Sequence, residues 1–128
     1  MNKTPDRVTW FELPADDMKR ASTFYSDVFG WSMSEMGGDS LVVRTAPSDD
    51  NLTPLEKGAI NGDLSPRFKE FDSPLIIITV EDLDAKIEMV INAGGKLVLP
   101  RRDITEMNIA WAIISDTEGN RIGVIQNL

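Results

Sequence analysis

The pattern of hydrophobic and polar residues predicts the same series of secondary-structure elements twice along the chain. In each half, a strand-like apolar run is followed by an aspartate, a stretch of helical periodicity and a terminal glycine. Equivalent positions in the two halves are 65 residues apart. A duplicated supersecondary unit is therefore predicted, with a site expected where the two copies face each other. The equivalent positions are Trp10 and Leu75, Asp17 and Asp82, and Gly30 and Gly95.

The first strand alternates between two faces. Phe11 and Leu13 are expected to pack under the following helix, whereas Trp10 and Glu12 point to the opposite face. The Pro-Ala pair at 14–15 is expected to end this strand.

The remaining elements follow from apolar periodicity, turn residues and helix caps. Asp16 or Asp17 caps the first predicted helix and Asp82 precedes the second. The run at 75–80 is almost continuously apolar, which predicts a strand that is buried on both faces. The predicted strands are 8–13, 31–36, 41–45 and 58–62 in the first half, and 75–80, 96–99, 109–115 and 121–126 in the second.

Each half therefore reads as strand, helix and three strands, which predicts the α+β class. The 128 residues fit a single domain, 1–128, with a first module at about 6–64 and a second at about 72–128.

Charge and composition limit the partners. The net charge of −8 opposes nucleic acid, because phosphates require a basic surface. The longest apolar runs are too short to cross a bilayer, so no membrane partner is expected. The polar N-terminal stretch carries no export signal and the chain has no cysteine, so a cytoplasmic location is predicted.

The chain has no histidine, which is the commonest general base and metal ligand. A Ser-His-Asp triad is therefore impossible. A bound metal would depend on carboxylate and carbonyl oxygens, which suit Ca²⁺ or Mg²⁺ better than Zn²⁺, Fe or Ni.

Motifs in both halves resemble the glyoxalase / bleomycin-resistance / extradiol-dioxygenase superfamily, also called vicinal oxygen chelate, and most of all its small glyoxalase-like bacterial members. The resemblance covers nearly the whole chain. It implies two βαβββ modules that form an open, cup-shaped mixed sheet with the helices outside. The motifs that carry it are Trp10-Phe11-Glu12-Leu13-Pro14, Asp17-Met18-Lys19-Arg20-Ala21, Val28-Phe29-Gly30-Trp31, Val80-Glu81-Asp82-Leu83-Asp84-Ala85, Ala93-Gly94-Gly95-Lys96 and Asp116-Thr117-Glu118-Gly119-Asn120.

The metal enzymes of this superfamily hold a divalent ion between histidines on the first strands and carboxylates on the last strands. In this chain the histidine positions fall on Trp10 and Leu75, and one carboxylate position falls on Gly123. The fourth ligand is expected near 59–61, where no carboxylate occurs. No metal ligand and no cofactor are therefore predicted.

Four residues are candidates for ligand binding. Trp10 could stack on a planar ligand or simply fill the cup, and Trp111 is expected to face the same cavity. Glu12 could act as a general base, anchor a cationic group, or form a structural salt bridge to Arg44 or Arg121. Asn61 would add a hydrogen bond, unless it only ends a strand.

Three functions remain open at this stage. The preferred hypothesis is a metal-independent protein that binds a small molecule in an apolar pocket, as a homodimer, which resembles the antibiotic-binding branch of the superfamily. The second is a metal-independent lyase or isomerase with Glu12 as its catalytic base. The third is a metal-dependent glyoxalase or dioxygenase, which the absence of histidine disfavours.

Overall fold

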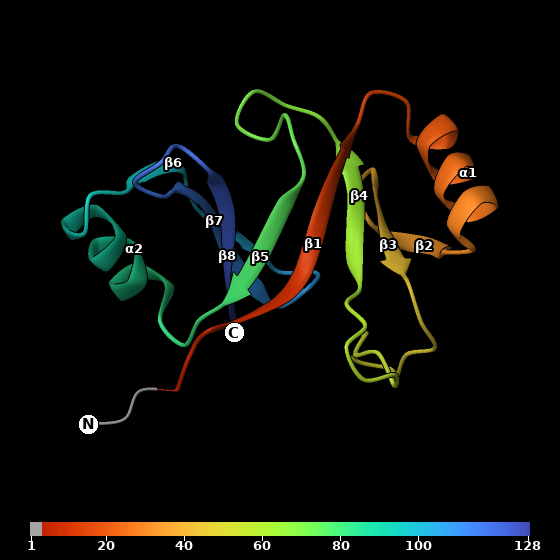
Figure 1. The fold of residues 1–128 in the computed structure, drawn as a ribbon, viewed down its shortest axis with the longest axis horizontal. Helices are drawn as coiled ribbons and strands as arrows, with labels where there is room; N and C mark the ends of the chain where they lie inside the picture. Colours follow the sequence, from red (N-terminus) through yellow and green to blue (C-terminus); the bar gives the residue numbers. More distant parts are fainter. Residues whose placement is uncertain (1–3) are drawn as a thin grey trace. The chain divides into compact units, whose positions relative to one another are not determined.

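The computed structural model describes residues 4–128, and these form two compact units. One unit spans 10–74, and the other comprises 75–128 together with the residues up to Thr9. Each unit has one helix and a four-stranded sheet (Figure 1). Within the described chain, neither helix is both long and apolar enough to span a membrane.

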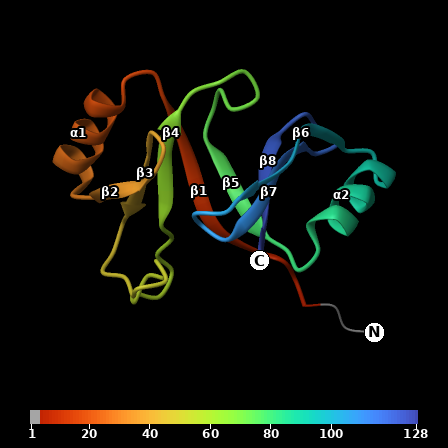
Figure 2. The ribbon, with the colours of Figure 1, turned by 180° about the vertical axis from the view of Figure 1, so that it is seen from behind.

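The first unit has a mixed sheet with the order β2-β3-β4-β1. Strands β1 and β4 run parallel, and the other neighbours are antiparallel. Helix α1 packs against one face of this sheet (Figure 2). Its elements are β1 (Arg7–Ala15), α1 (Met18–Phe29), β2 (Ser32–Gly37), β3 (Ser40–Arg44) and β4 (Gly62–Pro66).

The second unit repeats this connectivity in the order β5-β8-β7-β6. Its first and last strands, β5 and β8, are again the parallel pair. The α+β class and the two βαβββ modules are thus confirmed, whereas the cup remains a prediction. Its elements are β5 (Leu75–Thr79), α2 (Leu83–Asn92), β6 (Lys96–Ile104), β7 (Ile109–Ser115) and β8 (Arg121–Asn127).

The helix caps are those that the sequence predicts. Asp17 accepts a hydrogen bond from the backbone N–H of Arg20 at 2.9 Å, and Asp82 accepts one from Ala85 at 3.1 Å. These bonds satisfy backbone donors that lack a partner within the first turn. Gly30 ends α1 in the left-handed region, with φ of 72°.

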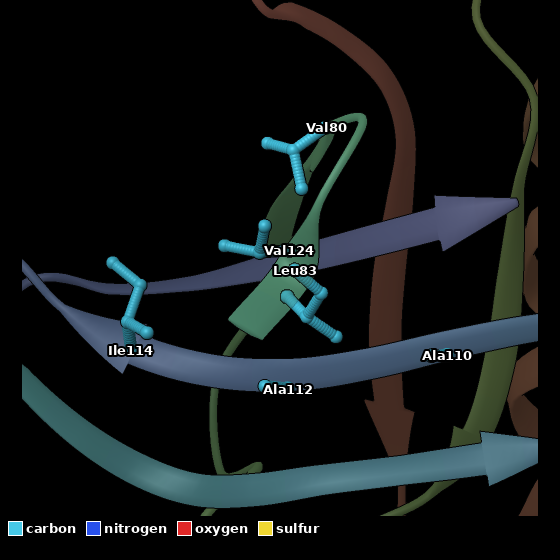
Figure 3. Packing of buried hydrophobic residues seen from close by; sticks show 6 residues of the cluster. All are labelled: Val80, Leu83, Ala110, Ala112, Ile114 and Val124. Atoms are coloured by element: carbon cyan, nitrogen blue, oxygen red, sulfur yellow. The ribbon is translucent and has the colours of Figure 1, made fainter. Parts of the chain in front are cut away.

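The core of the second unit lies between α2 and its sheet. Figure 3 shows that this cluster combines bulky side chains with Ala110 and Ala112 of β7, whose small side chains let the helix approach closely. Odd-numbered positions of β7, including Trp111, therefore point to the opposite face of the sheet. The buried members of the cluster are Val80, Leu83, Ala110, Ala112, Ile114 and Val124.

Four strand predictions were wrong. The strand placed at 96–99 extends further, as β6 (Lys96–Ile104). The strand placed at 58–62 is instead Gly62–Pro66, because the side chain of Asn61, rather than a backbone ladder, bonds the N–H of Thr45 at 3.0 Å. The pair at 14–15 does not end β1, since the parallel pairing with β4 continues to Ala15. The β5 strand is not buried on both faces, because 49% of Ile76 is exposed.

Candidate functional site

The two faces of the first sheet have opposite characters. Phe11, Leu13 and Ala15 of β1 belong to the apolar cluster under α1, as the alternation predicts. Trp10 and Glu12 therefore lie on the face that points away from the helix. Polar side chains from β3 and β4 occupy that same face, so it is the chemically distinctive surface of this unit.

A pair of carboxyl groups forms the centre of this face. Glu12 of β1 is in register with Asp63 of β4, so their side chains leave neighbouring parallel strands on the same side. Only 3% of Asp63 is exposed. The two carboxyl groups are joined by a hydrogen bond, which requires that one of them carries a proton.

Both oxygen atoms of Asp63 accept further hydrogen bonds. The indole Nε1 of Trp10 donates to Oδ2 at 2.7 Å, and the Oγ of Ser65 donates to Oδ1 at 2.7 Å. The Oγ of Ser40 lies 2.7 Å from that of Ser65. Donors that converge on one carboxylate stabilise its charged form.

The environment of the pair favours a proton on Glu12. Burial, followed by the charge of Asp63 and the hydrogen bond to it, raises the pKa of Glu12 from 4.5 to about 9. Burial also raises the pKa of Asp63, but hydrogen bonds from Trp10, Ser65 and Glu12 oppose this effect. The two acids therefore titrate as a coupled pair, in which burial favours the neutral form of both and the hydrogen bonds favour the charged form of Asp63.

The ion pair considered between Glu12 and Arg44 does not form within the described residues. The guanidinium of Arg44 instead donates to the Oγ of Ser34 at 2.6 Å on the neighbouring strand. The ion pair with Arg121 would join the two units and stays a prediction. The partner of Glu12 in the first unit is thus another acid, which leaves proton transfer open as a role.

Asn61 is completely buried, and all of its side-chain polar atoms are engaged within the first unit. Its Oδ1 accepts from the N–H of Thr45, while its Nδ2 donates to Ser48 at 2.8 Å and to the carbonyl of Leu52 at 2.9 Å. These bonds anchor the loop between β3 and β4. Its direct contact with a ligand stays a prediction.

The structure brings together Trp10 and Glu12, but it assigns Trp111 to the other unit. Trp111 is partly buried on the face of its sheet opposite α2. Whether it contributes to the same site as Trp10 stays a prediction. In the same unit, the side chain of Gln126 accepts a hydrogen bond from the N–H of Leu83 at 2.8 Å and so supports the start of α2.

Asp63 is the site residue that the sequence reasoning missed. It occupies the same place in the first unit as Gly123 in the second, because Glu12 is in register with Asp63 as Ile77 is with Gly123. The statement that the fourth metal-ligand position lacks a carboxylate was therefore wrong. The misplaced strand at 58–62 caused this error.

Asp63 places a carboxylate at one of the four positions where the resemblance implies a metal ligand, and the absence of a metal site stays a prediction. The indole of Trp10 stands at a histidine position and donates to Asp63, so it occupies the carboxylate rather than a metal. Leu75 and Gly123 have no side-chain atom that could coordinate a metal ion. In residues 4–128, no three His, Cys, Asp or Glu side chains form a cluster suited to a metal ion.

Comparison with known proteins identifies the family. A family model described as bleomycin resistance protein-like N-terminal matches residues 7–43. A glyoxylase-like domain-containing protein of Didymella fabae is 30% identical over 119 residues, which cover 89% of this chain and 88% of the relative. The chain therefore belongs to the glyoxalase/bleomycin-resistance superfamily.

Two further relatives define the extent of the likeness. CFP32 of Mycobacterium bovis, named as a glyoxylase, is 27% identical over 123 residues; the match covers 91% of this chain but only 44% of CFP32. The chain thus matches less than half of that relative. The methylmalonyl-CoA epimerase of Streptomyces coelicolor has the same fold, with a TM-score of 0.69 and 14% identity, covering 97% of this chain and 96% of the epimerase.

Proposed function

We propose that this chain binds a small molecule on the face of the first sheet that carries Trp10, Glu12 and Asp63. The observation that carries the proposal is the pair of acids in register on neighbouring strands, of which Asp63 is buried and accepts a hydrogen bond from the indole of Trp10. Burying two carboxyl groups together is costly for folding unless they are paired and hydrogen-bonded. Acids whose pKa values are strongly shifted by burial and by a neighbouring charge are enriched at functional sites.

The arrangement suits a ligand with both a planar part and a polar group. The indole of Trp10 offers a flat apolar surface, while the acid pair can donate or accept hydrogen bonds. The net negative charge of the pair would favour a cationic group on the ligand. This is consistent with the bleomycin-resistance relationship.

Calorimetric titration with two probes, bleomycin and methylmalonyl-CoA, tests the proposal. We expect one of them to bind with a dissociation constant below about 1 mM, corresponding to roughly 4 kcal/mol. Glu12→Gln and Asp63→Asn should weaken that binding about tenfold or more. The matched control is Asp103→Asn, because Asp103 is an exposed residue of β6 in the other unit.

Two results together would contradict the binding function. One is that neither probe binds. The other is that native mass spectrometry of protein purified from its own host detects no retained small molecule. The same spectra report the predicted homodimer, and elemental analysis of the sample should find no stoichiometric transition metal, because Trp10, Leu75 and Gly123 supply no ligand.

A second candidate function is proton transfer at a carbon atom, as in an isomerase or lyase. It is favoured by the shared proton, because a group with a pKa near 9 can act as an acid at neutral pH. Glu12 could accept a proton only when ionised, so its action as a base should increase as the pH rises toward 9. Deuterium exchange into the α-carbon of methylmalonyl-CoA, followed by NMR, tests this activity.

Exchange at the same rate in wild type and Glu12→Gln would exclude Glu12 as the base. An exchange rate that falls as the pH rises from 6 to 9 would contradict the assigned protonation state.

A further inference from the structure

A chain of hydrogen bonds leads from the acid pair to the hydroxyl groups of two serines. Ser65 lies two residues after Asp63 on β4, so both side chains share one face of the sheet. Ser40 is the first residue of β3 and meets Ser65 from the neighbouring strand. The two serines have no role in the binding site proposed above.

The number of hydroxyl protons determines which group donates and which accepts in each of these hydrogen bonds. The hydroxyl of Ser65 has one proton, which it donates to Oδ1 of Asp63 at 2.7 Å. The contact of 2.7 Å between the two serines must therefore use the proton of Ser40, with the Oγ of Ser65 as acceptor. Ser40 thus restrains Ser65 in the orientation that donates to Asp63.

Without these donors, burial would favour the opposite arrangement of the proton. Asp63 is the more deeply buried acid, at 3% exposure, whereas Glu12 is only partly buried. Desolvation penalises the charged form of an acid, so burial alone would place the proton on Asp63. The hydrogen bonds to its two oxygens oppose that preference, because they stabilise the charged form of Asp63.

We propose that Ser65, oriented by Ser40, is a positioning residue that keeps the shared proton on Glu12 and the negative charge on Asp63. The importance of this role rests on the binding function proposed above. If the proton stays on Glu12, a ligand meets one arrangement of donor and acceptor. If the proton moves between Glu12 and Asp63, the ligand meets two such arrangements. Trp10 acts with Ser65 by donating to the second oxygen of Asp63.

The other groups on this face of the first sheet do not account for the asymmetry. The alternation of β3 brings Ser40, Val42 and Arg44 to the face, and Arg44 is the charged residue among them. Its guanidinium donates to Ser34 of β2, which is itself uncharged. The pKa of Glu12 is raised by burial and then by the charge of Asp63, rather than by an interaction with Arg44.

Carboxyl carbon NMR of the ligand-free protein, labelled with ¹³C at Asp and Glu side chains, tests the proposal. In the wild type, we expect Asp63 to titrate in the lower transition of the pair and Glu12 in the upper one. In Ser65→Ala, the apparent pKa of Asp63 should rise by about one pH unit, since a charged hydrogen bond is lost. The carboxyl carbon of Asp63 should then also change its chemical shift in the upper of the two titration steps.

Two further variants separate positioning from simple packing. Ser65→Thr retains the hydroxyl and should restore the titration of the wild type, while Ser40→Ala should produce a smaller shift in the same direction as Ser65→Ala. Ser73→Ala, at an exposed position outside the strands, is the matched control and should change neither transition.

Unchanged titration of both acids in natively folded Ser65→Ala would overturn the proposal. If that variant does not fold, unchanged titration in Ser40→Ala would overturn it equally. Because no ligand is present in these measurements, they can fail while the binding experiments succeed. Conversely, if the variants titrate as predicted but neither probe binds, the result counts against the proposed binding function and not against the role of Ser65.

Discussion

Glu12 and Asp63 are in register on two neighbouring parallel strands, and burial together with the nearby carboxyl group of Asp63 raises the pKa of Glu12. The pair lies on the opposite side of the sheet from α1. Its neighbours Trp10 and Ser65 come from the same two strands. The charge and protonation of this face are therefore consequences of strand register, and single substitutions should change them in specific ways.

The stability of the protein should depend on pH through Glu12. The pKa of this group is about 9 in the folded state and near 4.5 when unfolded, so the folded protein binds more protons between these values. Its contribution to stability is complete below about pH 4.5 and declines as the pH rises to 9. The slope due to Glu12 should approach, at most, about 1.4 kcal/mol per pH unit.

Glu12→Gln should remove this slope and leave the free energy of unfolding higher than that of wild type at pH 8. Urea unfolding measured at pH 5, 7 and 9 provides the test. Glu118→Gln, in an exposed turn of the other unit, is the control and should retain the slope of the wild type. Identical slopes for Glu12→Gln and wild type would contradict the raised pKa.

Trp10→Phe should destabilise the chain through the loss of one hydrogen bond. Phenylalanine retains a flat ring but removes the donor to Oδ2 of Asp63, which then remains buried with one donor fewer. We expect a loss of about 1–3 kcal/mol in the free energy of unfolding, together with a higher pKa for Asp63. Thermal and urea unfolding measure the first effect, and carboxyl NMR measures the second.

The matched control for this substitution is Trp111→Phe. The indole N–H of Trp111 forms no hydrogen bond with the described residues, so the change is one of ring size alone. An equal loss of stability in the two variants would show that the bond between Trp10 and Asp63 contributes nothing measurable.

Asn61→Ala should release the loop between β3 and β4. The substitution leaves the N–H of Thr45 and the carbonyl of Leu52 without the partners that Asn61 provides. Trypsin should then cleave after the exposed Lys57 about tenfold faster or more, because the loop opens more often. Mass spectrometry of the fragments identifies the cleavage site.

Asn51→Ala is the control, since Asn51 lies on the same loop and is exposed. Only its backbone N–H is bonded, to Asp49, and alanine retains that group. Equal rates of cleavage in the two variants would show that Asn61 does not anchor the loop.

Gly62→Ala should disrupt the approach of β1 to β4. A Cβ atom at this position would lie 2.3 Å from the carbonyl oxygen of Phe11 and 2.6 Å from its ring, so the strands must separate. We expect a loss of about 3 kcal/mol in the free energy of unfolding, and a weaker contact between the neighbouring acids. Urea unfolding and the carboxyl NMR titration measure the two effects.

Gly38→Ala provides the comparison, because a Cβ there meets no atom within 4 Å and the cost arises only from its φ of +55°. That cost should be about 1 kcal/mol. If Gly62→Ala were no more destabilising than this variant, the close approach of the strands would be unimportant.

The parts of the fold that were predicted correctly depend on local signals. The helix caps at Asp17 and Asp82, and the facing of Phe11 and Glu12, follow from spacing along a short stretch of chain. The repeat itself was visible because three pairs of equivalent positions share the spacing of 65 residues.

The position of Asp63 within a strand could not be predicted from such local signals. Only Leu64 is apolar among residues 62–66, so β4 has almost no alternating pattern. The connection from β3 to β4 is also longer than its counterpart in the second unit, which breaks the constant spacing before Asp63. The protonation of Glu12 depends on this long-range register, and local periodicity carries no information about it.

The hydrogen bonds that determine the protonation of the pair come entirely from β1, β3 and β4 of one module. Duplication has therefore produced unequal halves: one copy carries an ionisable centre, and the other has Ile77 and Gly123 at the equivalent places. Mutations in the second copy therefore leave the residues that form these hydrogen bonds unchanged. Evolution could thus change one half of the duplicated scaffold without rebuilding the strands that carry the acid pair.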